Sequence, residues 1–361
     1  MTVTGTDIDP QKLEAAVGKV LSIFAGSMLN YMIDIGHRTG LLATAAQGPG
    51  TSEELAARAG LTERYVREWL AAMVTGGVFD YDPATTTYTV PAAVAAVLTG
   101  GPLPLAVMAG LQTHLAKHVG AVARAFREGG GVPYSAYRPE LTDLIDQIGR
   151  TWCDTALLDA YLPLVDGLAA QLEAGAAAAD IACGTGHALV VLARRFPAST
   201  FAGFDLDEGA IARARAEASG AGLTNVRFEV TDVARLDLID AFEAVFVFDA
   251  IHDQVDPAGV LGCINTALKP DGVFIMKEPR AGDALEDNIS NPFAPILYSM
   301  STLHWLTVSL AHGGAGIGTA FGEQLARKLL ADAGFANVTV EAAPGDPTDS
   351  VYIARKAGEA R

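Results

Sequence analysis

The sequence predicts an α/β fold in which a small helical domain with a β-hairpin precedes a parallel sheet flanked by helices. Two observations predict this fold. After Gly175, apolar runs of strand length alternate with helical patterns, which is typical of a parallel sheet covered on both faces. Between residues 51 and 90, two helices with capping signals precede two short strand-like runs. We expect domains at residues 1–100 and 176–361, joined by a helical linker or lid over 101–175.

The N-terminal segment is predicted to be helical, with one broad apolar face. Apolar residues recur at helical spacing from Leu13 to Leu42, at Val17, Leu21, Phe24, Met28, Met32 and Ile35. A small domain cannot cover so large a face by itself. We therefore expect the chain to form a homodimer through this segment.

Residues 51–90 follow the order helix, turn, helix, hairpin that is typical of a winged-helix domain. Thr51 and Glu54 form a capping-box signature, and Thr62 is expected to cap the second helix. A domain of this kind can read DNA, so a transcriptional regulator is one alternative function. Residues 51–74 nevertheless carry three arginines against four glutamates, whereas a helix that meets phosphates would be basic.

Composition and charge restrict the function further. The chain of 361 residues has 42 acidic and 25 basic side chains, a net charge of −17, which disfavours a nucleic-acid partner. No run of about twenty uncharged apolar residues appears, so no membrane partner is expected. The N-terminus shows no secretory signal pattern, and the three cysteines are too few for a disulfide framework. A cytoplasmic protein is expected.

A glycine-rich turn after the first predicted strand is the main chemical signal. The segment 180–186, Asp-Ile-Ala-Cys-Gly-Thr-Gly, lies between that strand and a helix, where backbone N–H groups can approach a ligand. A dinucleotide site would need a third small residue where Leu189 stands, which argues against NAD. Asp205 ends the next predicted strand, where its carboxylate could accept hydrogen bonds from both ribose hydroxyls. Alternatively, Asp205 only caps the following helix.

The chain resembles class I S-adenosylmethionine-dependent methyltransferases over roughly residues 176–356. The resemblance rests on a series of features in sequence order: the turn 180–186, Asp205, Thr231-Asp232 and the segments 268–272 and 333–335. The resemblance implies a Rossmann-like, seven-stranded methyltransferase domain, S-adenosyl-L-methionine as the cofactor and no metal. The family usually has glycine where Ala182 stands. The implied cofactor-binding residues are Asp180, Ala182, Gly184, Gly186, Asp205, Leu206, Asp232, Val233, Phe248 and Asp249.

Almost the whole chain also resembles plant-type small-molecule O-methyltransferases and their actinobacterial relatives with a winged-helix N-terminal domain. The resemblance implies that His252 is the general base, with Asp253 beside it and Glu278 orienting it. A second family glutamate aligns near Ala320, so its role is either absent or supplied by Glu323. An imidazole of near-neutral pKa can take a hydroxyl proton while the oxygen attacks a methyl carbon. Alternatively, His252 only hydrogen-bonds a loop.

Other histidines carry weaker signals. His114 and His118, four residues apart, could bind a metal from one helix face, but without a nearby third ligand a solvated or pocket-lining pair is preferred. His187 could cap a helix or reach the pocket mouth. Residues 292–312 could wall an acceptor pocket, or could pack on the sheet or on a partner subunit.

The predicted function is transfer of a methyl group from S-adenosylmethionine to a small-molecule acceptor, assisted by a histidine base. The alternatives are the regulator described above and a cofactor-binding enzyme of another reaction type. The acceptor's identity, and O- against N- or C-methylation, are left open.

Overall fold

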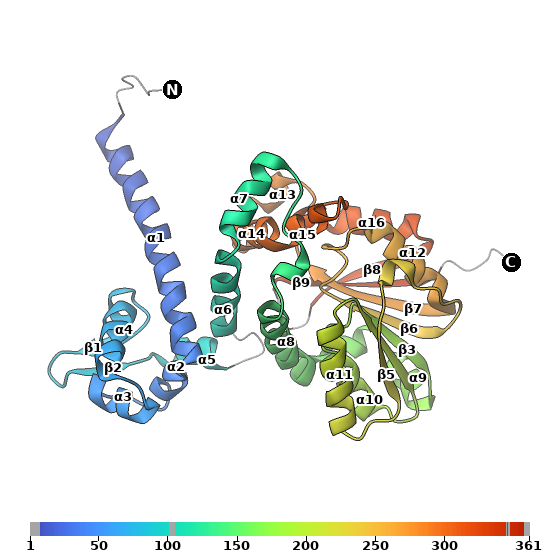
Figure 1. Ribbon diagram of the computed structural model, residues 1–361, viewed down its shortest axis with the longest axis horizontal. Coiled ribbons are helices and arrows are strands. Elements are labelled where there is room, and N and C mark those ends of the chain that lie inside the picture. Colours follow the sequence, from blue (N-terminus) through green and yellow to red (C-terminus); the bar gives the residue numbers. More distant parts are fainter. Residues whose placement is uncertain (1–7, 101–104, 344, 346, 357–361) are drawn as a thin grey trace. The chain divides into compact units, whose positions relative to one another are not determined.

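The computed structural model describes residues 8–100, 105–343, 345 and 347–356. They fall into two compact units, Met1–Thr113 and His114–Arg361, and both are drawn in Figure 1. The division lies inside the predicted linker 101–175, so the later helices of that segment belong to the same unit as the sheet. The predicted boundary after residue 100 adjoins residues 101–104, which lie outside the described residues.

The first unit has the predicted winged-helix order. Thr51 and Glu54 form the expected capping box, with each side chain accepting the other's backbone N–H at 3.3 and 2.9 Å. Thr62 occupies the predicted N-cap position but makes no capping hydrogen bond through its side chain. The elements are α1 (Pro10–Arg38), α2 (Leu41–Ala45), α3 (Ser52–Ala59), α4 (Glu63–Thr75), β1 (Asp80–Asp82), β2 (Thr87–Thr89), α5 (Ala92–Thr99) and most of α6 (Leu105–Ala116).

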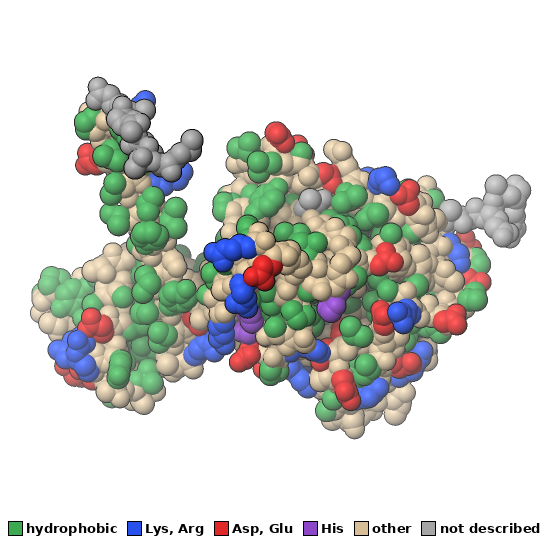
Figure 2. Space-filling model, turned by 45° about the horizontal axis from the view of Figure 1, so that its top comes forward, with side chains coloured by type: hydrophobic (Ala, Val, Ile, Leu, Met, Phe, Trp, Pro, Cys, Tyr) green, Lys and Arg blue, Asp and Glu red, His purple; other side chains and the backbone are tan. Residues whose placement is uncertain are grey.

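The segment expected to form one or two helices is mainly the single 29-residue helix α1. Asp9 caps it by accepting the Gln11 N–H at 2.9 Å. The C-terminal half of α1 packs on the winged-helix core, where the Trp69 indole N–H donates a hydrogen bond to the Met32 carbonyl at 2.7 Å. Towards its N-terminus large apolar side chains are exposed, and Figure 2 shows them along the helix. They are Leu13, Val17, Val20, Leu21, Ile23, Phe24 and Met28.

Helix α1 also alters one expectation. By length and composition it is apolar enough to cross a membrane, with a mean hydropathy of 1.3 over its most apolar window and none of that window buried. No such segment was expected from the sequence. The difference arises because residues 20–33 carry no charged side chain and lie within one continuous helix.

The second unit is built on the predicted seven-stranded sheet. Its strand order is β5-β4-β3-β6-β7-β9-β8, parallel from β5 to β7, with β9 antiparallel to both of its neighbours. The strands are β3 (Ala177–Ile181), β4 (Thr200–Asp205), β5 (Val226–Val230), β6 (Phe242–Phe248), β7 (Leu268–Pro279), β8 (Phe335–Ala342) and β9 (Asp349–Lys356). The fold class predicted from sequence is confirmed.

Helices cover both faces of this sheet (Figure 1). Alternation along β6 shows why, because Ala244 and Phe246 join one apolar core while Val245 and Val247 join the other. The first face is covered by η2 (Cys153–Tyr161), η3 (Leu162–Leu164), α9 (Leu168–Ala174), α10 (His187–Arg195) and α11 (Glu208–Gly220). The second is covered by η4 (Val233–Arg235), α12 (Pro257–Ala267) and α16 (Glu323–Asp332).

The remaining helices form a layer above the carboxyl ends of the strands. Val132 donates its backbone N–H to Thr307 Oγ1 at 2.9 Å. A Cβ atom on Gly131 would lie 1.9 Å from the Thr307 carbonyl oxygen, so only glycine allows this approach. The elements of this layer are α7 (Val119–Glu128), η1 (Tyr134–Ala136), α8 (Glu140–Trp152), α13 (Leu285–Asn288), α14 (Ala294–Met300), η5 (Ser301–Trp305), α15 (Leu306–Ala311) and η6 (Gly318–Ala320).

The turn between β3 and α10 uses the left-handed region of backbone conformation three times. Gly184 and Gly186 have φ of +54° and +72°, and Ala182 has φ of +58°. At Gly186 a Cβ atom would also lie 2.3 Å from the Phe228 ring. Glycine adopts this region freely, whereas a Cβ atom makes it unfavourable. Ala182 is therefore a strained residue at the place where a glycine was expected.

We predict that Ala182→Gly raises the free energy of unfolding by about 0.5 to 1 kcal/mol, because it removes the left-handed strain. Denaturant unfolding of the second unit measures this change. The matched control is Gly184→Ala, at a φ of +54° with open space around the new methyl group, which should destabilise by a similar amount. An Ala182→Gly variant that unfolds more easily than the parent would contradict the backbone assignment.

Candidate active site

Acidic residues gather at the end of the sheet that is formed by the carboxyl ends of its parallel strands. Asp180 lies in β3, Asp205 ends β4, Asp232 follows β5, Asp249 follows β6 and Glu278 lies near the end of β7. The carboxyl ends of these five strands meet at the same edge because the strands run parallel. Ligands of open α/β sheets bind at this edge. The topology therefore brings together the predicted cofactor-binding and catalytic residues.

Asp205 ties the glycine-rich turn to the second strand. Its Oδ2 accepts the Gly184 N–H at 2.8 Å, and its Oδ1 accepts the Asp207 N–H at 2.8 Å. Burial raises the pKa of Asp205, and the two backbone hydrogen bonds only partly offset this. Each oxygen keeps a further lone pair for a ligand hydroxyl. The geometry is compatible with the predicted ribose contact, which stays a prediction.

Asp180 adds a second carboxylate to the same site. It is 3 % exposed, and burial together with the nearby Asp205 raises its pKa well above the ordinary value. Two carboxylates in a low-dielectric site resist ionising together. A bound positive charge would relieve this repulsion, so the site favours a cationic ligand.

The other predicted cofactor residues have varied surroundings. Asp232 caps η4 through the Ala234 N–H at 3.2 Å and lies 3.5 Å from Arg235, so local partners already occupy its carboxylate. Val233 is buried, whereas Leu206 is 71 % exposed. Phe248 packs edge-on against Trp152, with ring centroids 4.9 Å apart. Their roles toward the cofactor remain predictions.

Asp249 is held by a lysine that the sequence analysis missed. Lys277 Nζ lies 2.6 Å from Asp249 Oδ2 and also pairs with Asp349. Burial lowers the pKa of Lys277, but the two carboxylates outweigh burial and hold the pKa well above its ordinary value. Asp349 lies 72 residues away in sequence. No local pattern signals this contact, because it depends on β7 and β9 pairing in the sheet.

His252 is anchored by Glu278, as the resemblance implied. Its Nδ1 lies 2.5 Å from Glu278 Oε2, while Glu278 Oε1 accepts the Ile251 N–H at 2.7 Å. Both side chains are buried. Nε2 of His252 has no hydrogen-bond partner among the described residues. The arrangement presents one ring nitrogen to a reactant and fixes the other, but the role of base stays a prediction.

The protonation of this group follows from its neighbours. Burial alone would lower the pKa of His252, but Glu278, with smaller contributions from Asp253 and Asp249, raises it to about 9. Burial raises the pKa of Asp253 to about 6, against the opposing effect of His252. His252 is therefore an imidazolium at neutral pH when no ligand is bound. A base role requires a ligand that lowers this pKa.

Glu323 is the candidate for the second family glutamate, which aligns near Ala320. Glu323 begins α16 and pairs with Arg327 at 2.8 Å, and its side chain is 55 % exposed. None of the hydrogen bonds and ion pairs of the described residues joins it to His252, which favours the alternative that this second support is absent. The side chain of Ala320 lies outside the described residues. Support for His252 comes from Glu278.

His187 belongs to a network of charges. Its Nδ1 lies 2.7 Å from Glu217 and its Nε2 lies 2.9 Å from Asp154. Arg150 binds Glu217 and also lies 2.9 Å from His187 Nδ1. The network links α8 and η2 to α10 and α11. His187 is therefore a connecting residue between helices.

The segment 292–312 contacts the catalytic candidate, and its role as the wall of an acceptor pocket stays a prediction. Trp305 packs edge-on against the His252 ring, with centroids 4.6 Å apart. His304 beside it is 5 % exposed. His114 is also buried, but no group of three metal-ligating side chains occurs among the described residues. This finding disfavours the metal interpretation of His114 and His118.

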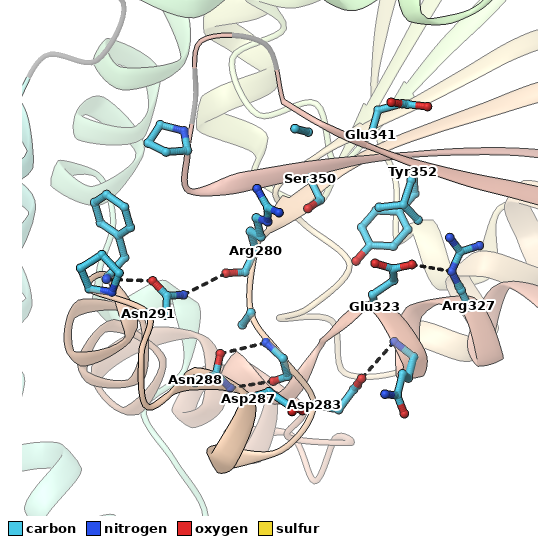
Figure 3. Close-up of a pocket in the computed structure, with 18 residues that line it drawn as sticks. Arg280, Asp283, Asp287, Asn288, Asn291, Glu323, Arg327, Glu341, Ser350 and Tyr352 are labelled. Atoms are coloured by element: carbon cyan, nitrogen blue, oxygen red, sulfur yellow. Dashed lines mark hydrogen bonds and ion pairs between the residues drawn. The ribbon is translucent and has the colours of Figure 1, made fainter.

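One cavity lies away from these residues, beyond the end of β7. It measures about 730 Å³ and is lined by polar residues including Arg280, Asp283, Glu323 and Tyr352. Figure 3 shows Arg280 between the strand ends and the α13 region, and Glu323 turned toward Arg327. None of the predicted site residues lines this cavity. We therefore place the candidate active site by the chemistry of its side chains and not by cavity size.

Comparison with curated proteins finds partial matches. Trans-aconitate 2-methyltransferase of Deinococcus radiodurans is 32 % identical over 104 residues, which cover 29 % of this chain and 38 % of that protein. The enzyme of the same name from an Acidovorax species is 26 % identical over 133 residues, or 37 % of this chain and 47 % of its own length. The chain thus spans less than half the length of these relatives.

Solved structures match over nearly the full length. The mitomycin 7-O-methyltransferase MmcR is 21 % identical, with a TM-score of 0.66, covering 96 % of this chain and 100 % of its own. Human N-acetylserotonin methyltransferase in complex with its S-adenosylmethionine ligand, SAM, is 17 % identical, with a TM-score of 0.69 and coverages of 98 % and 100 %. At these identities the likeness establishes the fold.

Two family models match separate parts of the chain. Residues 27–100 match the Rv2258c-like winged HTH domain, and residues 172–308 match a methyltransferase domain. The two matches agree with the winged-helix order of the first unit and with the glycine-rich turn and strand order of the second. The chain therefore carries a methyltransferase domain behind an Rv2258c-like winged helix-turn-helix domain.

Proposed function

We propose that the protein is an enzyme that transfers a methyl group from S-adenosyl-L-methionine to a hydroxyl oxygen of a small molecule. The observation that carries the proposal is the buried His252–Glu278 pair, whose free Nε2 lies at the same sheet edge as the glycine-rich turn. A histidine oriented in this way suits removal of a hydroxyl proton. The methyltransferase-domain match over residues 172–308 supports the reaction class.

In this proposal the cofactor lies over residues 180–186, with Asp205 at its ribose and Asp232 and Val233 flanking its adenine. The cofactor supplies a methyl group activated by a positively charged sulfur, so the chain mainly aligns the reactants. The carboxylates of Asp180 and Asp205 support this choice, because burial disfavours their charged forms and raises the pKa of both. A cationic ligand would stabilise their ionised forms.

Catalysis by this site begins with deprotonation of the acceptor at His252 Nε2. Glu278 then stabilises the imidazolium, since it already contacts Nδ1 at 2.5 Å. Because the unliganded His252 has a pKa of about 9, the ring must first lose its proton. A positive charge bound nearby lowers that pKa, because like charges repel. Binding of the methyl donor would thus favour the neutral form of His252, which can act as the base.

The names of the similar proteins support a small-molecule acceptor. The structural relatives are named for O-methylation of mitomycin and for methylation of N-acetylserotonin, and the curated relatives for methylation of trans-aconitate. These acceptors share no common scaffold. The comparison therefore supports the size class of the acceptor and leaves its identity open.

We propose that the winged-helix domain does not read DNA. On α4, Arg64 pairs with Glu68 at 2.6 Å, and Arg67 pairs with Glu63 at 3.2 Å. Arg58 on α3 donates to backbone carbonyls. The arginines of the helix-turn-helix segment are thus all engaged locally, whereas a DNA-reading helix needs them for phosphates and bases.

We also propose that a second copy of the chain covers α1, giving a homodimer in the cytoplasm. Leu21, Phe24 and Met28 are 59 to 61 % exposed on consecutive turns of one helix. An exposed apolar stripe of this kind is typical of a two-fold interface. Burial in a membrane is the competing fate of such a helix.

His252→Gln is predicted to lower kcat by about 10² to 10⁴ while leaving binding of S-adenosylhomocysteine near normal, because the base acts on the acceptor. The parent kcat/KM for S-adenosylmethionine should rise with pH toward about 9, because this parameter reports the pKa of His252 in the protein without bound donor. Below that pKa the ring carries its proton and cannot act as a base. Methyl transfer followed by mass spectrometry across pH 6 to 9 measures both effects.

Glu278→Gln is the matched control for this pH profile. Glutamine keeps the shape but removes the charge that raises the histidine pKa, so the rise of kcat/KM should move to lower pH. Full turnover of His252→Gln at every pH would contradict the base role, and alignment alone would then carry the reaction.

Phe24→Glu is predicted to convert the dimer into a monomer, because it places a charge in the proposed apolar interface. Light scattering at micromolar concentration measures the mass. Val97→Glu changes an exposed apolar residue outside α1 and should leave the mass unchanged. A parent protein that is monomeric and sediments with lipid vesicles would contradict the dimer and favour the membrane.

A further inference from the structure

Several buried histidines of the second unit have unsatisfied ring nitrogens. Buried polar atoms are normally hydrogen-bonded, and leaving one unpaired destabilises a protein, so a group of them indicates a missing partner. Five imidazole nitrogens among the described residues are buried without a hydrogen-bond partner. They are both ring nitrogens of His114 and the Nε2 atoms of His118, His252 and His304.

Aromatic contacts join His114, His118, Tyr137 and His304 into one wall. His118 packs on Tyr137 with ring centroids 4.1 Å apart, and Tyr137 meets His304 at 5.0 Å. Trp305, the next residue, contacts His252 at 4.6 Å. Tyr137 also donates its hydroxyl to the Leu303 carbonyl at 2.6 Å, which fixes η1 against η5. The wall is therefore rigidly connected and ends beside the candidate base.

The wall is neutral, unlike His252. Burial lowers the pKa of His304 to about 3, and the charge of His252 is the next largest cause. Burial also lowers the pKa of His114 and of His118. A neutral imidazole has one N–H donor and one acceptor nitrogen, so it can bind a hydroxyl or a carbonyl. It offers no charge for an anion or a cation.

We propose that His304 binds a second oxygen of the acceptor, next to the oxygen that His252 deprotonates. The inference rests on the proposed function. We infer a neutral, flat ring with two neighbouring oxygen groups as the acceptor, because aromatic rings contact both imidazoles: Trp305 contacts His252, and Tyr134 and Tyr137 contact His304. His304 is chosen over His114 and His118 because it is the sequence neighbour of the tryptophan that touches His252.

Catechol and phenol are suitable probes, because they differ by one hydroxyl at the position in question. The parent protein should methylate catechol with a kcat/KM about ten-fold above that for phenol, the usual effect of one hydrogen bond to a buried group. His304→Phe keeps the ring but loses both nitrogens. It should lower the catechol value about ten-fold and leave the phenol value unchanged.

Two further variants keep the test independent of folding. His304→Asn retains a donor and an acceptor and should recover part of the preference for catechol. His118→Phe makes the same change at the other end of the wall, and the preference should persist. An equal loss for both probes in His304→Phe, or an equal loss of preference in His118→Phe, would overturn the inference, because either indicates general repacking.

A direct binding measurement separates this inference from the proposed function. Calorimetry of catechol and phenol is carried out on the complex with S-adenosylhomocysteine, where no chemistry occurs. If the parent binds catechol more tightly than phenol in a manner lost in His304→Phe, the His304 contact stands even when neither probe is methylated, whereas the proposed function is tested separately by methyl transfer. Equal binding of both probes by the parent overturns the contact, whether or not methylation is observed.

Discussion

Repulsion among carboxylates at one sheet edge is the constraint on which the site depends. The parallel strands end together, which brings the buried Asp180 and Glu278 to the same end of the sheet as the half-buried Asp205 and the exposed Asp249. Such groups must be neutralised by protons, by protein cations or by a ligand. The structure uses protein cations for two of them, since Lys277 pairs with Asp249 and His252 with Glu278.

The remaining carboxylates explain the polarity of the site. Burial raises the pKa of both Asp180 and Asp205, and the charge of Asp205 raises the pKa of Asp180 further. The turn above them supplies backbone N–H groups, one of which Asp205 already accepts. A ligand with a positive charge and ribose hydroxyls fits these needs together. The same charge would lower the pKa of His252, which links donor binding to the readiness of the base.

The sequence predicted the parts of this site that follow from local patterns. Glycine spacing located the turn, and hydrophobic alternation located the strands, so Asp205 and His252 could be assigned to strand ends. Contacts set by tertiary packing could not be predicted. Lys277 finds Asp349 only because β9 inserts between β7 and β8. Glu323 instead pairs with Arg327, four residues later on the same helix, which is a local contact.

The most direct test of the account compares the pH dependence of binding for S-adenosylmethionine and S-adenosylhomocysteine by calorimetry. The former carries the positive sulfur and the latter does not. Since Asp180 and Asp205 have raised pKa values, acid protonates them and removes the attraction for a cation. The account predicts that the affinity for S-adenosylmethionine, relative to S-adenosylhomocysteine, increases with pH and that Asp205→Asn flattens this increase. An affinity ratio that is independent of pH in the parent protein would contradict it.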